Sequence, residues 1–147
     1  MIKIFLDTSS LFKLYHHENG TEELENVLLK FRITHIYLSE ITKVEFTSAL
    51  WKKVRTNEIY SEQAVITSKL FESDFEKYNF ISTDSLILEQ ARNLTIKYGI
   101  EGLRTLDSIQ LSTCKVIENQ VDIFITADKL LSFLIEKEGL NTRLPGS

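Results

Sequence analysis

The sequence opens with Ile2-Lys3-Ile4-Phe5-Leu6-Asp7, a short and mostly apolar run that ends at an acid. Such a run is typical of a strand that is buried inside a parallel sheet. A similar run, Asp122-Ile123-Phe124-Ile125-Thr126, lies late in the chain, and Tyr78 to Ile81 predicts another strand between the two. We also expect a brief strand or an extended link from His35 to Leu38.

Longer segments, in which apolar residues recur at helical spacing, separate these runs. The predicted helices begin near Leu11, Thr21, Thr42, Ser61, Asp84, Thr105 and Ala127. The helix that begins near Ser61 is expected to reach about Tyr78, and a last edge strand is expected from Leu140 to Leu144. Short strands that alternate with longer helices indicate a parallel sheet with helices on both faces. The sequence therefore predicts an α/β fold.

The composition suits one soluble domain. The chain has 147 residues, 43% of them apolar, and only one proline and five glycines, so no linker is expected. No run approaches about 18 consecutive apolar residues, and we expect no membrane span. The opening run is too short for a secretion signal, and the single cysteine, Cys114, has no partner for an internal disulfide. These features favour a reducing, cytoplasmic setting.

The position of each acid relative to the predicted strands separates candidate site residues from surface acids. In open α/β sheets, sites form beyond the carboxyl ends of the strands. Asp7 follows the first strand, and Asp128 lies just past the strand that ends near Thr126. Asp122 begins that same strand, so it should lie roughly 15–20 Å away, at the opposite edge of the sheet. Asp7 and Asp128 are therefore candidates, and Asp122 is not.

Two further acids lie in predicted helices. Asp107 lies about where a helix begins, a position at which the helix dipole alone favours a carboxylate. Glu45 lies inside a helix on the same face as Ala49, and it borders the stripe that contains Phe46. Glu40 is its main rival, although a loop or capping role suits that position better. Spacing alone leaves these assignments open, because acids are common.

Several carboxylates held together would suit a hard divalent cation, because Mg²⁺ and Mn²⁺ prefer oxygen ligands. A metal in such a site can position and deprotonate a water for attack on phosphorus, and it can stabilise charge on the leaving oxygen. No histidine or covalent nucleophile stands out. His16 and His17 are neighbours in the sequence, and on a helix they would point about 100° apart.

The formal net charge of −4 argues weakly against nucleic-acid binding, since proteins that bind phosphates are usually basic. Bound divalent ions would offset the charge of four acidic ligands. Basic residues also gather locally, at Lys52, Lys53 and Arg55 and again at Arg92, Lys97 and Arg104. Arg104 is the basic residue nearest in sequence to Asp107, and we expect it to contact substrate phosphate.

Several segments resemble motifs of the PIN-domain family, and within it of the VapC-type toxins of bacterial and archaeal toxin–antitoxin pairs. The similar segments are 4–9 (first-strand motif), 39–46 (helix-borne glutamate), 103–111 (third motif), 122–128 (fourth motif) and 139–146 (the usual ending). The first motif is common by itself. The third and fourth, in this order and at this separation, are much more specific.

The resemblance covers nearly the whole chain and implies a single PIN-like domain over residues 1–147. It implies a three-layer α/β/α fold with a central, mainly parallel sheet. It assigns catalytic and metal-binding roles to the acids of the four motifs, Asp7, Glu45, Asp107 and Asp128. Thr8, Ser9 and Thr126 match positions where the family often has small polar residues near the acids. In the helix after Asp107 the family is often alanine-rich, whereas this chain has Gln110, Ser112, Thr113 and Cys114.

The implied activity is that of a Mg²⁺- or Mn²⁺-dependent endoribonuclease, which would hydrolyse RNA phosphodiester bonds with a metal-activated water. The resemblance also implies a toxin that is often a homodimer and is inhibited by a small cognate antitoxin covering the active site. One alternative is a catalytically inactive PIN-like module that binds RNA or protein, but all four acids are present. Another is a phosphatase with a nucleophilic strand-end aspartate. That chemistry often needs a second acid two residues later, and here Asp7 is followed by Thr8-Ser9.

Overall fold

The structure is a computed structural model that describes residues 1–144. Within these residues five strands form one sheet in the order β3-β2-β1-β4-β5, and every neighbouring pair is parallel. The strands are β1 (Ile2–Leu6), β2 (Ile33–Ser39), β3 (Asn79–Ile81), β4 (Ile123–Ile125) and β5 (Thr142–Arg143). The first strand lies at the centre of the sheet, as the buried opening run predicts.

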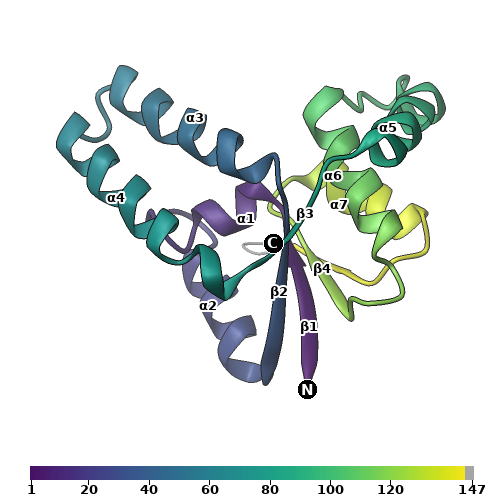
Figure 1. The fold of residues 1–147 in the computed structure, drawn as a ribbon, viewed down its shortest axis with the longest axis horizontal. Coiled ribbons are helices and arrows are strands. Elements are labelled where there is room, and N and C mark those ends of the chain that lie inside the picture. Colours follow the sequence, from purple (N-terminus) through teal and green to yellow (C-terminus); the bar gives the residue numbers. More distant parts are fainter. Residues whose placement is uncertain (145–147) are drawn as a thin grey trace.

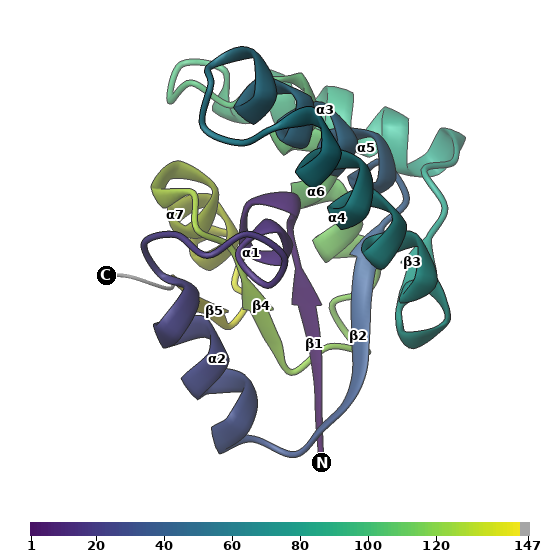
Figure 2. The same ribbon diagram turned by 90° about the vertical axis from the view of Figure 1, so that its left-hand side faces the viewer.

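Helices cover both faces of this sheet. They are α1 (Thr8–Phe12), α2 (Thr21–Lys30), α3 (Thr42–Arg55), α4 (Ser61–Ser73), α5 (Ser85–Tyr98), α6 (Thr105–Val116) and α7 (Lys129–Lys137), with a 3₁₀ turn, η1, over Phe75–Lys77. Figure 1 shows α1 to α4 on one side of the sheet and α5 to α7 on the other. Figure 2, turned by 90°, shows the parallel strands β1, β2 and β4 side by side. The predicted three-layer α/β/α fold is confirmed.

Alternation along β1 supplies a core to each face. Ile4 and Leu6 pack with residues of α1 to α4, whereas Phe5 packs with residues of α5, α6 and α7. All three side chains are fully buried. Successive side chains of a strand point to opposite faces, so a central strand between two helical layers must be apolar at both sets of positions. Cys114 is buried in the second of these cores, as expected for a small core residue.

Element boundaries differ from expectation mainly where tertiary contacts decide them. The helix predicted from Ser61 to Tyr78 ends at Ser73, and the chain then forms η1. Tyr15, on the segment after α1, donates its hydroxyl to Asp74 Oδ2 and lies 2.6 Å from the Tyr78 hydroxyl, which draws this corner onto the core. A partner so distant in sequence leaves no local signal of the break.

The remaining corrections are smaller. The second strand is a full strand from Ile33 to Ser39, and the last one covers only Thr142–Arg143. The helix expected from about Ala127 to Glu138 is shorter, because Asp128 caps it from outside. The predicted family-like ending at Pro145-Gly146 lies outside the described residues. In residues 1–144 no helix is long and apolar enough to cross a membrane.

Candidate functional site

The carboxyl ends of β1 and β4 bring the first and last motifs together. Leu6 pairs with Ile125 in the parallel register, so the residues that follow these two strands are neighbours. Helices that begin on opposite faces leave the sheet here, which makes the edge a topological switch point, where ligands bind in open α/β sheets. Asp7 follows β1 and Asp128 lies just beyond β4, whereas Asp122 precedes β4 and bonds to the backbone N–H of Lys3. The placement predicted for these three acids is confirmed.

Asp7 is buried, with 4% of its surface exposed, and its carboxylate is held by several donors. Thr126 Oγ1 donates to Oδ2 at 2.5 Å, Ser9 Oγ lies 2.8 Å from both oxygens, and the Ser10 N–H donates to Oδ1 at 3.0 Å. Burial raises the pKa of Asp7 to about 6, and the hydrogen bonds from Thr126, Ser10 and Ser9 oppose that rise. Ser9 and Thr126 thus contact the acid beside which they were predicted to lie.

Glu45 reaches the same place from α3. Its Oε1 accepts from Thr8 Oγ1 at 2.8 Å and from Gln110 Nε2 at 2.8 Å. The residue is half-buried, as expected for a position that borders the apolar stripe of its helix. Glu40, the rival candidate, is exposed and comes before α3. The geometry therefore favours Glu45.

Asp107 is the third residue of α6 and is half-buried. Burial raises its pKa, and the negative charges of Asp128 and Glu45 raise it further, whereas the Arg104 guanidinium opposes the rise. The charges of Asp128 and Glu45 therefore both act on the Asp107 carboxyl group. Asp128 also caps α7, because its Oδ1 accepts from the Leu131 N–H at 2.8 Å.

All four predicted acids line one hollow of about 240 Å³. Its lining consists of Asp7, Thr8, Ser9, Glu45, Ala49, Asp107, Gln110 and Asp128. Asp84, which also follows a strand and caps a helix, is absent from this lining and is exposed, as a capping acid would be. A position after a strand, with a capping role, therefore does not by itself define the site. The site is defined by the four acids that line one common hollow.

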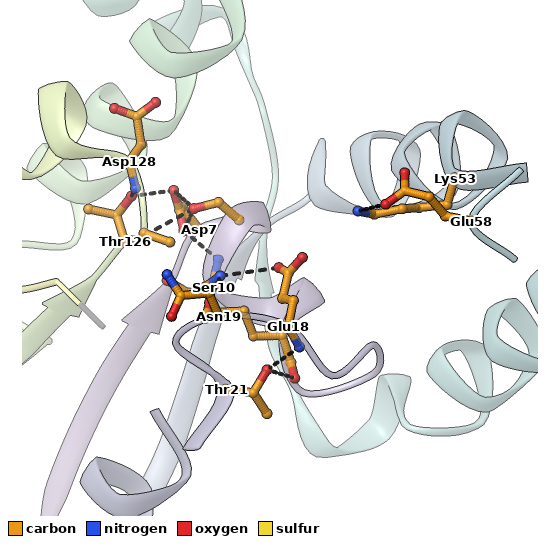
Figure 3. Close-up of polar contacts among 12 residues, drawn as sticks. Asp7, Ser10, Glu18, Asn19, Thr21, Lys53, Glu58, Thr126 and Asp128 are labelled. Carbon is orange, nitrogen blue, oxygen red and sulfur yellow. Dashed lines mark hydrogen bonds and ion pairs between the residues drawn. The ribbon is translucent and has the colours of Figure 1, made fainter. Parts of the chain in front are cut away.

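The carboxylates do not form a ready cage. Within residues 1–144 no group of three or more His, Cys, Asp or Glu side chains is arranged to hold a metal ion. Asp7, Glu45 and Asp128 instead accept hydrogen bonds from neighbouring groups, and Figure 3 shows the Asp128 carboxyl group directed away from Asp7. The donor set is nevertheless all oxygen and strongly negative, which suits a hard divalent cation and not a soft one. A metal here would require the carboxylates to move closer together.

Two groups of residues beside the acids were not predicted as site residues. Gln110 and Thr42 hydrogen-bond within the site, and the only sequence signal for Gln110 is its position three residues after Asp107, on the same helix face. A second hollow, of about 290 Å³, shares Thr8, Ser9 and Ala49 with the first. It carries the lysines Lys13, Lys52 and Lys53.

Two of these lysines are paired. Lys13 lies 3.1 Å from Glu18 and Lys53 lies 3.2 Å from Glu58, and Figure 3 shows the Lys53–Glu58 pair beside the site. No ion pair of Lys52 occurs among the described residues, and its side chain is exposed. Arg104, the predicted phosphate contact, is exposed near Asp107 but does not line either hollow.

Comparisons with known proteins agree with this fold. The family model described as the PIN domain matches residues 4–132. The chain therefore belongs to the PIN-domain family. No curated protein matches it at the sequence level.

Several solved structures share its fold. A VapC20 toxin from Mycobacterium tuberculosis, described as cleaving the sarcin–ricin loop, is 13% identical, with 97% of this chain and 99% of that chain covered and a TM-score of 0.71. FitAcB from Neisseria gonorrhoeae is 15% identical, with 95% of each chain covered and a TM-score of 0.68. A toxin–antitoxin complex from Klebsiella pneumoniae is 19% identical, with 85% and 86% covered and a TM-score of 0.61. At these identities the likeness is one of fold.

Proposed function

We propose that this chain is a single PIN-like domain, residues 1–147, that hydrolyses RNA internally with Mg²⁺ or Mn²⁺ and serves as the toxin of a toxin–antitoxin pair. The observation that carries the proposal is the convergence of Asp7, Glu45, Asp107 and Asp128 on one hollow at the carboxyl ends of β1 and β4. Membership of the PIN-domain family supports it. Solved neighbours that are described as toxins or toxin–antitoxin complexes also support it.

The four acids would hold the metal, with Asp7 as the most deeply buried ligand. When bound, the cation would supply an activated water and would stabilise negative charge on the phosphate and on the leaving oxygen. Thr126 and Ser9 orient the Asp7 carboxylate, and Thr8 orients Glu45. Hydrogen bonds of this kind fix how a ligand presents its oxygens, and their loss commonly weakens metal sites.

The substrate would approach along the second hollow, beside the acids. Lys52 lines it without an ion pair among the described residues, so its charge is available to an RNA phosphate. Arg104 would offer a second phosphate contact on the α6 side of the site, since its charge already acts on Asp107. These cations would make RNA binding possible despite the net charge of −4.

A cognate antitoxin is the protein partner that we propose. A largely apolar hollow of about 480 Å³ borders the acids, and Ile41, Val44 and Leu106 are part of its lining. Val44 is 73% exposed and Leu106 50% exposed, so this surface would gain from being covered. A partner seated there would also block access to Glu45, which lines the same hollow. Homodimer formation and a cytoplasmic location belong to the same proposal.

An inactive binding module is the second candidate, and the absence of a ready metal cage in residues 1–144 favours it. The two candidates differ in one measurement. The chain is incubated with an RNA pool, with and without Mg²⁺ or Mn²⁺, and the fragments are separated by size. Metal-dependent cleavage that Asp7→Asn abolishes and Asp122→Asn leaves intact supports the nuclease. RNA binding without cleavage by either form would instead support the module.

The toxin role is tested separately. Induced expression of the chain in a bacterial host should arrest growth, and co-expression of the short open reading frame next to its gene should relieve the arrest. Growth that is unaffected by an active enzyme would contradict the toxin role but leave the nuclease standing.

A further inference from the structure

Gln110 lines the same hollow as the four acids. It is 2% exposed, and its Nε2 donates to Glu45 Oε1 at 2.8 Å. The same nitrogen lies 3.2 Å from Thr8 Oγ1 and 3.2 Å from Thr42 Oγ1. One buried amide therefore contacts three oxygen acceptors, which belong to α1 and α3.

These contacts cross the molecule. Figure 1 shows α3 on one side of the sheet and α6 on the other. Glu45 comes from the first side, whereas Asp107 comes from the second and lies three residues before Gln110 on α6. Asp107 and Gln110 share a helix face because of that spacing. The Gln110 amide is thus a direct link between the helix that carries Asp107 and the side chain of Glu45.

We propose that Gln110 is a positioning residue, which holds the Glu45 carboxylate at the hollow and so fixes its place relative to Asp107. The inference rests on the proposed function, because it assigns Gln110 a role in the same metal site. A neutral amide suits this role, since it donates to a carboxylate without cancelling the negative charge that a cation requires. An arginine or lysine here would pair with Glu45 and compete with the metal.

Stability alone does not account for a glutamine at this position. Gln110 Oε1 is buried and has no hydrogen-bond partner among the described residues. A buried polar atom without a partner is a cost that an apolar side chain of the same size would avoid. If Gln110 served only packing, Gln110→Met would be neutral or favourable to folding. If it positions Glu45, the same substitution damages the metal site while leaving the fold intact.

The experiment measures Mn²⁺ affinity by calorimetry, and Tm by circular dichroism, for the wild-type chain and matched variants. Gln110→Met should weaken Mn²⁺ binding about tenfold or more, the usual effect of losing a partner that orients a ligand, while the chain stays folded and still unfolds in a cooperative transition. Gln110→Asn keeps the amide but is one methylene shorter, so it should weaken binding as well. Gln90→Met is the control, because Gln90 accepts a hydrogen bond from Ser112 on α6 and neither residue lines the hollow. This variant should leave Mn²⁺ affinity unchanged.

A double variant separates an effect that Gln110 exerts through Glu45 from a general effect on Mn²⁺ binding. In Glu45→Ala, the group through which Gln110 acts is gone, so adding Gln110→Met should weaken Mn²⁺ binding no further. Affinity equal to wild type in a folded Gln110→Met, or a full additional loss in the Glu45→Ala background, would overturn the proposal. Should Gln110→Met fail to fold, the same comparisons are made with Gln110→Asn.

Failure of the nuclease proposal is distinguishable from failure of this one. If Mn²⁺ binds with the expected dependence on Gln110 but no RNA is cleaved, the positioning role stands and the nuclease falls. If the wild-type chain binds no Mn²⁺, crystal structures of wild type and Gln110→Met decide the positioning role. One ordered Glu45 rotamer in wild type and several in the variant support it, and an unchanged single rotamer in the variant refutes it.

Discussion

The strand-end acid Asp7 and the helix-borne acid Glu45 line the same hollow, yet they are held in opposite ways. Asp7 takes its hydrogen bonds from Ser9 and Ser10, its neighbours in sequence, and from Thr126 on the adjacent strand end. Glu45 takes its bonds from Thr8 and Gln110, which are 37 and 65 residues away. The sheet register positions the first acid, whereas packing between separate helices positions the second.

The difference also concerns burial. Asp7 is 4% exposed and Glu45 only half-buried, so an uncompensated charge is far more costly at Asp7. In the proposed metal site, Asp7 at the strand end would therefore be a buried ligand whose charge is unfavourable without a cation. Glu45 on the helix would be a ligand whose place depends on the side chains of Thr8 and Gln110. Substitutions at and around Asp7 should therefore differ from substitutions around Glu45 in their effects on metal binding, activity and stability.

The largest effect on RNA cleavage is expected when Asp7 is substituted. Asp7→Asn removes the most buried carboxylate, and RNA cleavage in Mg²⁺ should fall by about a thousandfold or more. Initial rates on a labelled RNA measure it, with Asp122→Asn as the control acid at the other end of β4. The free energy of unfolding of metal-free Asp7→Asn at pH 7 should rise by about 1–3 kcal/mol, because a buried charge is removed. Equal activity of Asp7→Asn and wild type would contradict the role that we propose for Asp7.

The next effect is on pH dependence. The pKa of Asp7 is raised from 3.8 to about 6, so the carboxylate that a metal needs is lost as the pH falls through 6. Mn²⁺ affinity should therefore fall about tenfold between pH 7 and pH 5. Calorimetric titrations at these two pH values measure the change. A flat profile would show that Asp7 does not control metal binding.

Metal-free stability should change in the opposite sense. The folded chain binds the Asp7 proton more tightly than the unfolded chain does, since burial raises the pKa. Below pH 3.8 both states are protonated and Asp7 imposes no penalty. Between 3.8 and 6 the penalty grows to about 3 kcal/mol, so stability contributed by this group falls as the pH rises through that window. Comparison with Asp7→Asn, which lacks the group, isolates it from other acids.

The contrast also explains how far the sequence could take the prediction. Asp7 and Asp128 follow from local pattern and one rule about parallel sheets, because β1 and β4 are visible as apolar runs. Glu45 and Asp107 needed motif resemblance, since a helix pattern gives a face but not the helix that it meets. The predicted helix start near Thr42 made Glu40 a loop or capping acid, but it was the motif resemblance that preferred Glu45 to Glu40.

What sequence reasoning missed depends on contacts between distant segments. Gln110 was noted only as a departure from an alanine-rich helix, because nothing local shows that its amide reaches α1 and α3. The break before η1 was missed for the same reason, as Tyr15 and Asp74 are 59 residues apart. A motif also does not fix how a side chain is oriented, so the sequence could not predict that the Asp128 carboxyl group points away from Asp7, as Figure 3 shows.

A smaller effect is expected at Thr126, which donates a hydrogen bond to Asp7. Thr126→Val removes the hydroxyl that donates to Asp7 Oδ2 at 2.5 Å and accepts from the Asp128 N–H at 3.0 Å. That hydrogen bond lowers the pKa of Asp7, so its loss should move the acid limb of the pH–rate profile upward and reduce activity about tenfold. Thr126→Ser, which keeps the hydroxyl, is the matched control. An unshifted profile in Thr126→Val would remove Thr126 from the site.

The smallest effect is expected on the helix side, at the cations rather than the acids. Glu45, Ala49 and Lys52 lie on one face of α3, and Lys52 lines the hollow beside the acids. Lys52→Ala should weaken RNA binding a few-fold, about equally for all sequences, and should lower the slope of log affinity against log salt by about one. Fluorescence anisotropy with a short RNA over a series of salt concentrations measures both, with Lys69→Ala, on the exposed side of α4, as the control.

Arg104→Ala should behave like Lys52→Ala if the phosphate contact predicted for it exists. An effect of Lys52→Ala without one of Arg104→Ala would place the RNA along α3 alone, and would make the helix side responsible for substrate while the strand ends hold the metal.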